Sequence, residues 1–253
     1  MKSLVSVRRA LLAVLLSLSA VTAQAGELTV SAASSLSQAF KELARSFEAG
    51  HPGAKVRLNF GASGALLQQM AKGAPVDVFA SADEETMEAA ISRGLVAAGE
   101  RRDFARNTLV LVVPSDSPFA LGQLEDLTQP GVRRIALGNP ASVPVGRYAR
   151  RALEAARLWQ PLQAKAIPTQ HARQALDYVA RGEVEAGFVY ATDAAVMPDK
   201  VRVAFTVPLY IPIRYPVARL AGSAHAEEAA RFIDYVRSPA GLAILGRHGF
   251  LKP

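Results

Sequence analysis

The sequence predicts an α/β protein whose strands and helices are grouped into two lobes. Three observations favour this fold class. Apolar runs of strand length alternate with amphipathic segments of helical length along the chain. The chain has 253 residues, of which 50% are hydrophobic, and this is enough for two buried cores. The strands also fall into two groups, one before about residue 105 and one between about residues 108 and 215.

The first group is predicted to hold three units, each an apolar strand followed by small or polar residues and an amphipathic helix. These units are 27–31 with 36–48, 55–60 with 65–72, and 76–81 with 84–93. In the helix at 36–48, residues Leu36, Phe40, Leu43 and Phe47 recur at helical spacing. Strands that alternate with helices indicate a mainly parallel sheet.

The second group continues the alternation with strands, two helices and a β-rich stretch. Its predicted strands are 107–113, 134–138 and 185–190, its helices are 146–157 and 172–181, and its β-rich stretch is 201–218. Two last helices, 226–237 and 239–247, are expected to return to the first lobe. The predicted domains are therefore a discontinuous first lobe, 26–106 with 217–253, and a second lobe, 107–216. Two crossing segments would join them as a hinge.

The first 25 residues are typical of a secretory signal peptide. Lys2, Arg8 and Arg9 precede an uncharged apolar run at 10–21, and a small-residue cleavage site ends at Ala25. A membrane anchor is the alternative, but the run is shorter than the roughly 20 apolar residues that span a bilayer. We therefore expect cleavage after Ala25 and an exported, soluble protein.

Charge and cysteine content exclude several classes of protein. Cleavage would leave 228 residues and lower the formal net charge from +7 to +4, because residues 1–25 hold three cations and no acids. A mildly basic balance assists the approach of an anion but is too weak for nucleic-acid binding. The chain has no cysteine, which excludes a disulfide framework, a thiolate metal site, a cysteine nucleophile and a lipid-modified N-terminal cysteine.

Two serines lie between a predicted strand and a predicted helix. Ser35 follows small residues at 32–34, and Ser63 lies in the turn at 61–64. Such serines commonly cap helices. Because the pattern occurs twice, at the carboxyl ends of neighbouring strands, a ligand site is the competing interpretation. Two converging helix N-termini with hydroxyl and amide donors would bind an anion without lysine or arginine.

A site built only from donors would favour a fully deprotonated oxyanion, because a protonated phosphate needs a nearby acceptor. Neither serine loop contains a carboxylate. Asp83, Glu84 and Glu85 follow a neighbouring strand, and they are expected to cap the helix that they begin.

The ordered motifs of the mature chain resemble one known family, the periplasmic molybdate-binding proteins of bacterial molybdate ABC importers. The resemblance covers nearly the whole mature chain, and its motifs are 33–36, 61–64, 73–83, 107–114, 138–144, 187–193, 215–217 and 248–250. It implies the two-lobed periplasmic-binding-protein fold of type II, with a ligand cleft between the lobes.

The resemblance also implies a ligand set for molybdate or tungstate. The first lobe would supply the hydroxyls of Ser35 and Ser63, and the second lobe would supply the amides of Val145 and Ala172 and the hydroxyl of Tyr190. These groups would bind the oxygens of the oxyanion and would not coordinate the metal directly. No catalytic residue and no cofactor are implied. The protein is expected to be a monomer, and its expected partner is an inner-membrane ABC permease.

One segment of this ligand set departs from the pattern of the family. At 169–172, the chain has Gln170 and His171 where an acidic and a branched apolar residue are common, so the amide donor is Ala172 or its neighbour. His171 is either a donor at the rim of the cleft or a surface histidine. Arg147 and Arg173 lie beside the implied amides, and they are expected to form surface ion pairs without a role in binding.

Two other functions compete with molybdate binding. A receptor for sulfate, thiosulfate or another tetrahedral oxyanion would differ chiefly in the size of its site. A secreted hydrolase would need a nucleophile or paired acids such as Asp77 and Asp83, but the Gly-x-Ser-x-Gly motif is absent and these acids are six residues apart. The histidines show no spacing typical of a base or metal site, and they are His51, His171, His225 and His248.

Overall fold

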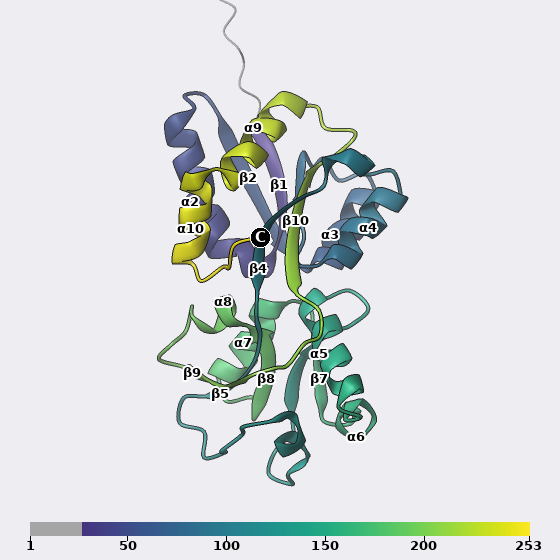
Figure 1. Ribbon diagram of the computed structural model, residues 1–253, viewed down its shortest axis with the longest axis vertical. Coiled ribbons are helices and arrows are strands. Elements are labelled where there is room, and N and C mark those ends of the chain that lie inside the picture. Colours follow the sequence, from purple (N-terminus) through teal and green to yellow (C-terminus); the bar gives the residue numbers. More distant parts are fainter. Residues whose placement is uncertain (1–26) are drawn as a thin grey trace, which may run out of the picture.

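The protein forms two lobes that are stacked along its longest axis, each with a five-stranded sheet between helices (Figure 1). The computed structural model describes residues 27–253, and the predicted signal peptide at 1–25 lies outside them. The strand order is β2-β1-β3-β10-β4 in the first sheet and β7-β6-β8-β5-β9 in the second. The two-lobed α/β fold predicted from the sequence is confirmed.

The strands of the first sheet are β1 (Glu27–Ala33), β2 (Lys55–Gly61), β3 (Val78–Ala80), β4 (Arg102–Asn107) and β10 (Ile213–Arg219). Those of the second sheet are β5 (Leu109–Pro114), β6 (Ile135–Gly138), β7 (Ala166–Thr169), β8 (Ala186–Tyr190) and β9 (Val201–Thr206).

The first lobe contains the helices α2 (Ser37–Gly50), α3 (Ser63–Ala71), α4 (Glu84–Ser92), α9 (Ala226–Arg237) and α10 (Pro239–Arg247). The second lobe contains α5 (Pro144–Ala155), α6 (Trp159–Gln163), α7 (Ala172–Ala180) and α8 (Ala191–Ala194). Short 3₁₀ turns are η1 (Ser34–Leu36), η2 (Ala98–Glu100) and η3 (Leu124–Thr128). Within residues 27–253, every helix is too short or too polar to span a membrane.

Each sheet is mixed, with a parallel part and an antiparallel part. In the first sheet, β1 pairs in parallel with β2 and β3, whereas β10 is antiparallel to β3 and β4. In the second sheet, β6 is parallel to β7 and β8, whereas β5 is antiparallel to β8 and β9. The antiparallel strands β5 and β10 are those that the chain enters directly from the other lobe. No helical crossover within the lobe precedes them, and a parallel neighbour would require one.

Helices cover both faces of the first sheet. Helices α2, α9 and α10 lie on one side, and α3 and α4 lie on the other (Figure 1). The apolar stripe predicted for the first helix is buried, since Leu36, Phe40, Leu43 and Phe47 have no exposed surface. Phe40 and Phe47 also pack edge-on against Phe232 of α9, so the C-terminal helices belong to the core of the first lobe.

Several elements differ from those predicted. The segment predicted as one strand from residue 107 is divided, because β4 ends at Asn107 in the first sheet and β5 begins at Leu109 in the second. Most of β4 was not predicted, because its charged edge-strand sequence lacks an apolar run. The short elements β7, α6 and α8 were also missed. The stretch at 201–218 forms two strands in different sheets, β9 and β10.

The chain crosses between the lobes twice, after Asn107 and between Thr206 and Ile213. These two crossings lie side by side at the front of the molecule in the view of Figure 1. The predicted lobe boundary after residue 216 falls within β10, all of which pairs with the first sheet.

Candidate functional site

The five residues singled out in the sequence line one small cavity between the lobes. Ser35 and Ser63 approach it from the first lobe, and Val145, Ala172 and Tyr190 approach it from the second. Its other lining residues are Ala33, Ser34, Gly61, Ala62, Ala82, Val143 and Pro144. The cavity lies at the carboxyl ends of β1 and β2, where open α/β sheets bind ligands.

Neither serine caps its helix. Ser35 lies in the 3₁₀ turn η1, ahead of α2, and Ser63 is the first residue of α3. The N-cap positions are Leu36 for α2 and Ala62 for α3, and neither helix has a side-chain cap. Both serines are buried, and their hydroxyls instead contact the Tyr215 hydroxyl and the Ala82 amide, each at 3.0 Å. The capping interpretation is wrong for this pair.

The second lobe contributes the starts of two helices. Pro144 is the first residue of α5 and Val145 the second, while α7 begins at Ala172. Amides in the first turn of a helix have no acceptor within the helix, so they point toward the cavity end as donors. His171 is the N-cap of α7, and its Nδ1 accepts a hydrogen bond from the Gln174 amide at 3.1 Å. This histidine thus has a capping role that the sequence did not reveal.

Tyr190 ends β8 and is fully buried, rather than half-buried with its hydroxyl in water. Its hydroxyl reaches across the cleft and donates to the Ala82 carbonyl of the first lobe at 3.5 Å. Burial raises the pKa of the Tyr190 hydroxyl well above its ordinary value, so the group keeps its proton. Because this bond is long, the Tyr190 hydroxyl could donate to a ligand oxygen instead.

The cavity is lined only by uncharged residues among those that the structure describes. Its positive potential comes instead from the N-termini of α3, α5 and α7, which converge on it. Burial of a dianion requires several charge-assisted hydrogen bonds, each contributing about 1.5 to 3 kcal/mol. Two hydroxyls, a tyrosine and two free amides would supply such a set.

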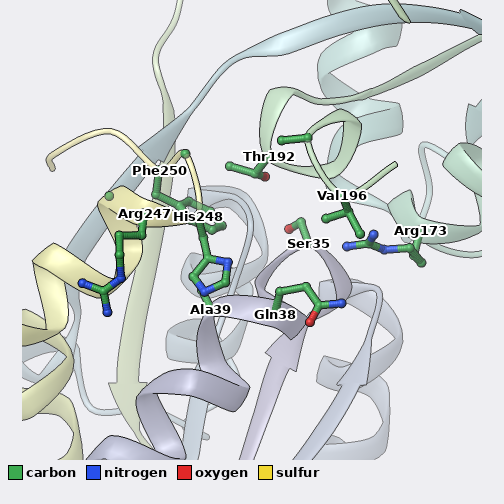
Figure 2. A pocket seen from close by; sticks show the side chains of 12 residues that line it. Ser35, Gln38, Ala39, Arg173, Thr192, Val196, Arg247, His248 and Phe250 are labelled. Carbon is green, nitrogen blue, oxygen red and sulfur yellow. The ribbon is translucent and has the colours of Figure 1, made fainter. Parts of the chain in front are cut away.

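A larger pocket of about 230 Å³ adjoins the cavity and shares Ser35 with it. Figure 2 shows Gln38 and His248 of the first lobe on one side, and Thr192, Val196 and Arg173 of the second lobe on the other. The pocket reaches Ser35 from the side of the cleft formed by α2, α8 and α10. Ser35 therefore lines both cavities.

Arg173 pairs with a buried acid instead of forming a surface ion pair. Its Nη2 lies 3.3 Å from Oδ1 of Asp193, whose side chain is fully buried. Burial raises the pKa of the Asp193 carboxyl from 3.8 to about 6, and the Arg173 guanidinium opposes this rise. The folded protein therefore favours protonated Asp193 more than the unfolded chain does.

The raised pKa of Asp193 predicts a pH-dependent effect on stability. Its contribution is fully present below pH 3.8 and is lost as the pH rises through about 6, a loss of about 3 kcal/mol. The variant Asp193→Asn is expected to melt roughly 6 to 12 °C above the wild type at pH 8, with little difference at pH 4. Thermal unfolding at both pH values tests this, with exposed Asp116→Asn as the control. A difference independent of pH would contradict it.

The ion pair of Arg147, which was also expected on the surface, crosses the cleft. Arg147 of α5 donates from Nε to Oδ2 of Asp83 at 2.8 Å and from Nη2 to the Thr86 hydroxyl at 2.6 Å. Asp83 also caps α4, as predicted, since its Oδ1 accepts from the Thr86 amide at 3.2 Å. Nearby, Arg151 contacts Glu85 at 2.9 Å. These contacts hold α4 of the first lobe against α5 of the second.

Loss of the Arg147 side chain is expected to weaken ligand binding by roughly tenfold to a hundredfold, because closure would then bury the Asp83 carboxylate without its cationic partner. The variant Arg147→Ala tests this by calorimetry. Adding Asp83→Asn should restore part of the affinity, since asparagine still caps α4 without a charge. The control is Arg150→Ala, which breaks an exposed pair with Glu154 inside α5. Equal losses in both arginine variants would argue against a role in closure.

The residues considered for catalysis or metal binding do not form a site. Asp77 and Asp83 lie beyond opposite ends of β3, and Asp77 instead accepts from the Thr29 amide and lies 3.3 Å from His225. His248 contacts Glu42 at 2.7 Å. Among residues 27–253, no group of three or more acidic, cysteine or histidine side chains could hold a metal ion.

Three residues at the site were not assigned from the sequence. The amide and the carbonyl of Ala82 bond to Ser63 and Tyr190, and the side chains of Asn107 and Tyr215 bond to one another beside Ser35. Asn107 and Tyr215 open two of the motifs that carry the resemblance, at 107–114 and 215–217, but their contacts depend on long-range pairing of β4 and β10.

The chain is similar to proteins that bind solutes outside the cytoplasm. Residues 28–251 match the family described as bacterial extracellular solute-binding protein. The chain is 35% identical over 234 residues to the molybdate-binding protein ModA of Escherichia coli, covering 90% of each protein. It is also 35% identical to ModA of Mycobacterium tuberculosis H37Rv, covering 92% of this chain and 87% of that protein.

Among solved structures, the periplasmic molybdate-binding protein of Azotobacter vinelandii superposes with a TM-score of 0.80. It is 27% identical, and the match covers 90% of this chain and all of that one. The likeness therefore extends over both lobes.

Proposed function

This chain belongs to the bacterial extracellular solute-binding proteins, and we propose that it captures molybdate, and also tungstate, in the periplasm and delivers the oxyanion to an inner-membrane ABC importer. The relatives named as molybdate-binding proteins support this ligand, since they match about nine tenths of the chain. The proposal assigns the cleft between the lobes as the binding site.

One observation carries the proposal: five donor groups from both lobes surround a cavity whose described lining is uncharged. The oxyanion would accept hydrogen bonds from the hydroxyls of Ser35, Ser63 and Tyr190 and from the amides of Val145 and Ala172. An anion held only by donors needs no proton of its own, so molybdate suits this set. The protein would require no cofactor.

Capture would depend on closure of the lobes about the two chain crossings. We assign 26–107 with 213–253 to one moving body and 108–212 to the other. When the lobes are apart, the oxyanion would meet Ser35 and Ser63 first. Closure would then bring the donors of the second lobe onto the ligand and would form the contacts between α4 and α5. The closed protein would present one shape to the permease.

The remaining features of the proposal concern export and mode of action. Residues 1–25 would act as a cleavable signal peptide, which leaves a soluble monomer in the periplasm. The protein would act by binding alone, without a chemical step, and would not bind nucleic acid.

Titration calorimetry of residues 26–253 with molybdate, tungstate, sulfate and thiosulfate tests this function. We expect molybdate and tungstate to bind roughly tenfold or more tightly than sulfate. Tighter binding of sulfate or thiosulfate would identify a receptor for smaller oxyanions, and no binding of any of them would contradict the proposal. Calorimetry is preferable to tryptophan fluorescence, because the single tryptophan, Trp159, is partly buried beside Leu162 and Phe188 of the second lobe and does not line the cavity.

A further inference from the structure

The direction of the hydrogen bonds at Ser35 and Ser63 would influence which anions bind at the proposed site. A serine hydroxyl has one proton and two lone pairs, so it can donate to a ligand or accept from one. A fully deprotonated oxyanion offers only acceptors, whereas hydrogen phosphate carries a proton that requires an acceptor. The groups behind each serine therefore influence selectivity without touching the ligand.

Ser63 is held as a donor by the backbone. The Ala82 amide donates to its Oγ at 3.0 Å. Because a peptide N–H can only donate, Ser63 is the acceptor in this bond and its own proton is not used there. Ser63 is fully buried, and among residues 27–253 no acceptor for its own proton is recorded outside the cavity. The proton of Ser63 is therefore left to point toward the ligand.

Ser35 faces the Tyr215 hydroxyl at 3.0 Å, and either oxygen could donate. The direction is determined by Asn107, which lies at the end of β4 where the chain leaves the first lobe. Its Nδ2 lies 3.2 Å from the Tyr215 hydroxyl. If Nδ2, and not Oδ1, faces Tyr215, the Tyr215 oxygen must accept from Asn107. The single proton of the Tyr215 hydroxyl can then be donated to Ser35.

The orientation of the Asn107 amide group follows from a peptide N–H. The Thr108 amide donates to Oδ1 of Asn107 at 2.9 Å, which places the oxygen on that side and Nδ2 on the other. Nδ2 uses its second proton for the Thr192 hydroxyl of the second lobe, at 2.9 Å. The series of donors therefore runs in one direction, from Thr108 through Asn107 and Tyr215 to Ser35.

We propose that Tyr215 and Asn107 are positioning residues that hold Ser35 as a hydrogen-bond donor, as the Ala82 amide holds Ser63, so that both serines favour an oxyanion without a proton. The inference rests on the proposed function and explains how the same site would select by protonation state. Burial raises the pKa of the Tyr215 hydroxyl well above its ordinary value, so Tyr215 retains the proton that it donates.

Contact with Thr192 links this series to closure. Asn107 belongs to the first lobe and Thr192 to α8 of the second, and their bond is buried between the lobes. The Asn107 side chain is therefore fully bonded only when the lobes are in contact. Ser35 is consequently held as a donor in the state that encloses the ligand.

The test compares sulfate with hydrogen phosphate, two tetrahedral dianions of similar size that differ by one proton. Their ability to displace molybdate is measured by competition calorimetry at pH 8 for the wild type and Tyr215→Phe. Without the tyrosine hydroxyl, no neighbour fixes the direction of the Ser35 hydroxyl, which can then rotate to accept from hydrogen phosphate. We expect molybdate affinity to fall roughly tenfold and the preference for sulfate over hydrogen phosphate to fall by a similar factor.

The control is Tyr235→Phe, which removes an exposed tyrosine-to-serine bond of 2.6 Å to Ser46 and should change neither quantity. A second variant, Asn107→Asp, replaces Nδ2 with an acceptor that draws the Tyr215 proton away from Ser35. The added charge repels sulfate and hydrogen phosphate alike, so their ratio should again fall while molybdate affinity falls further.

Equal weakening of sulfate and hydrogen phosphate in both variants, or an unchanged ratio, would overturn the inference and indicate that Tyr215 only supports the fold. Failure of hydrogen phosphate to displace molybdate from the variants would overturn it as well. Failure of the proposed function is distinguished from failure of this inference by the wild type, which would then bind no molybdate. If the wild type prefers sulfate, the same ratio still tests the positioning of Ser35.

Discussion

Replacement of both Ser35 and Ser63 by alanine is expected to weaken molybdate binding by roughly 100-fold to 10,000-fold. Each hydroxyl would donate a charge-assisted hydrogen bond to a buried dianion, and each such bond contributes about 1.5 to 3 kcal/mol. The cavity has no charged lining residue among those described, so no other group compensates for the loss. Titration calorimetry of the double variant with molybdate measures the effect.

The matched control for this double variant is Ser46→Ala with Ser92→Ala. Both serines are exposed on helices of the first lobe and lie outside the cavity. Thermal unfolding without ligand is recorded for both double variants, because loss of Ser63 also leaves the Ala82 amide without its acceptor. A folded Ser35/Ser63 variant that binds molybdate as tightly as the control would defeat the ligand assignment.

The variant Gly64→Ala is expected to block closure and to weaken molybdate binding a hundredfold or more, while the lobes stay folded. Gly64 lies in α3, and its amide donates to the Ser142 carbonyl across the cleft at 3.0 Å. A Cβ at this position would lie 2.6 Å from that carbonyl oxygen and 2.9 Å from the Ser142 Cα. Backbone atoms cannot rotate away, so the lobes must separate.

Separation of the lobes would withdraw the amides of Val145 and Ala172 and the Tyr190 hydroxyl, a loss of roughly two charge-assisted bonds or more. Calorimetry measures the affinity, and small-angle scattering measures whether molybdate still compacts the protein. The control is Gly50→Ala at the end of α2, where an added Cβ meets nothing within 4 Å. Normal compaction of the Gly64 variant would show that the cleft tolerates the extra carbon.

The two lobes and most of their elements were predictable because local pattern determines them. Leu36, Phe40, Leu43 and Phe47 recur at helical spacing, and the strand–small residue–serine–helix unit occurs twice. The elements that were missed are short or carry charges at the edge of a sheet. In β4, burial comes from pairing with β10, which lies more than a hundred residues away in the sequence.

The candidate site was predictable to a similar extent. Ser35 and Ser63 stand out by their local pattern, but Val145, Ala172 and Tyr190 were taken from the resemblance, because helix starts and strand ends are common throughout the chain. The structure brings the five residues to one cavity. Their role as ligands stays a prediction until oxyanion binding is measured.

By itself, the sequence determined the α/β class, the two lobes, a basic charge balance, the absence of cysteine chemistry and the two serine loops. These properties follow from composition and from periodicity over short segments. Only the tertiary structure decided which groups stand behind the serines, because a hydroxyl has no fixed direction until its neighbours are known. The Ala82 amide, Asn107 and Tyr215 supply that direction, and the bond from Arg147 to Asp83 exists only when the lobes meet.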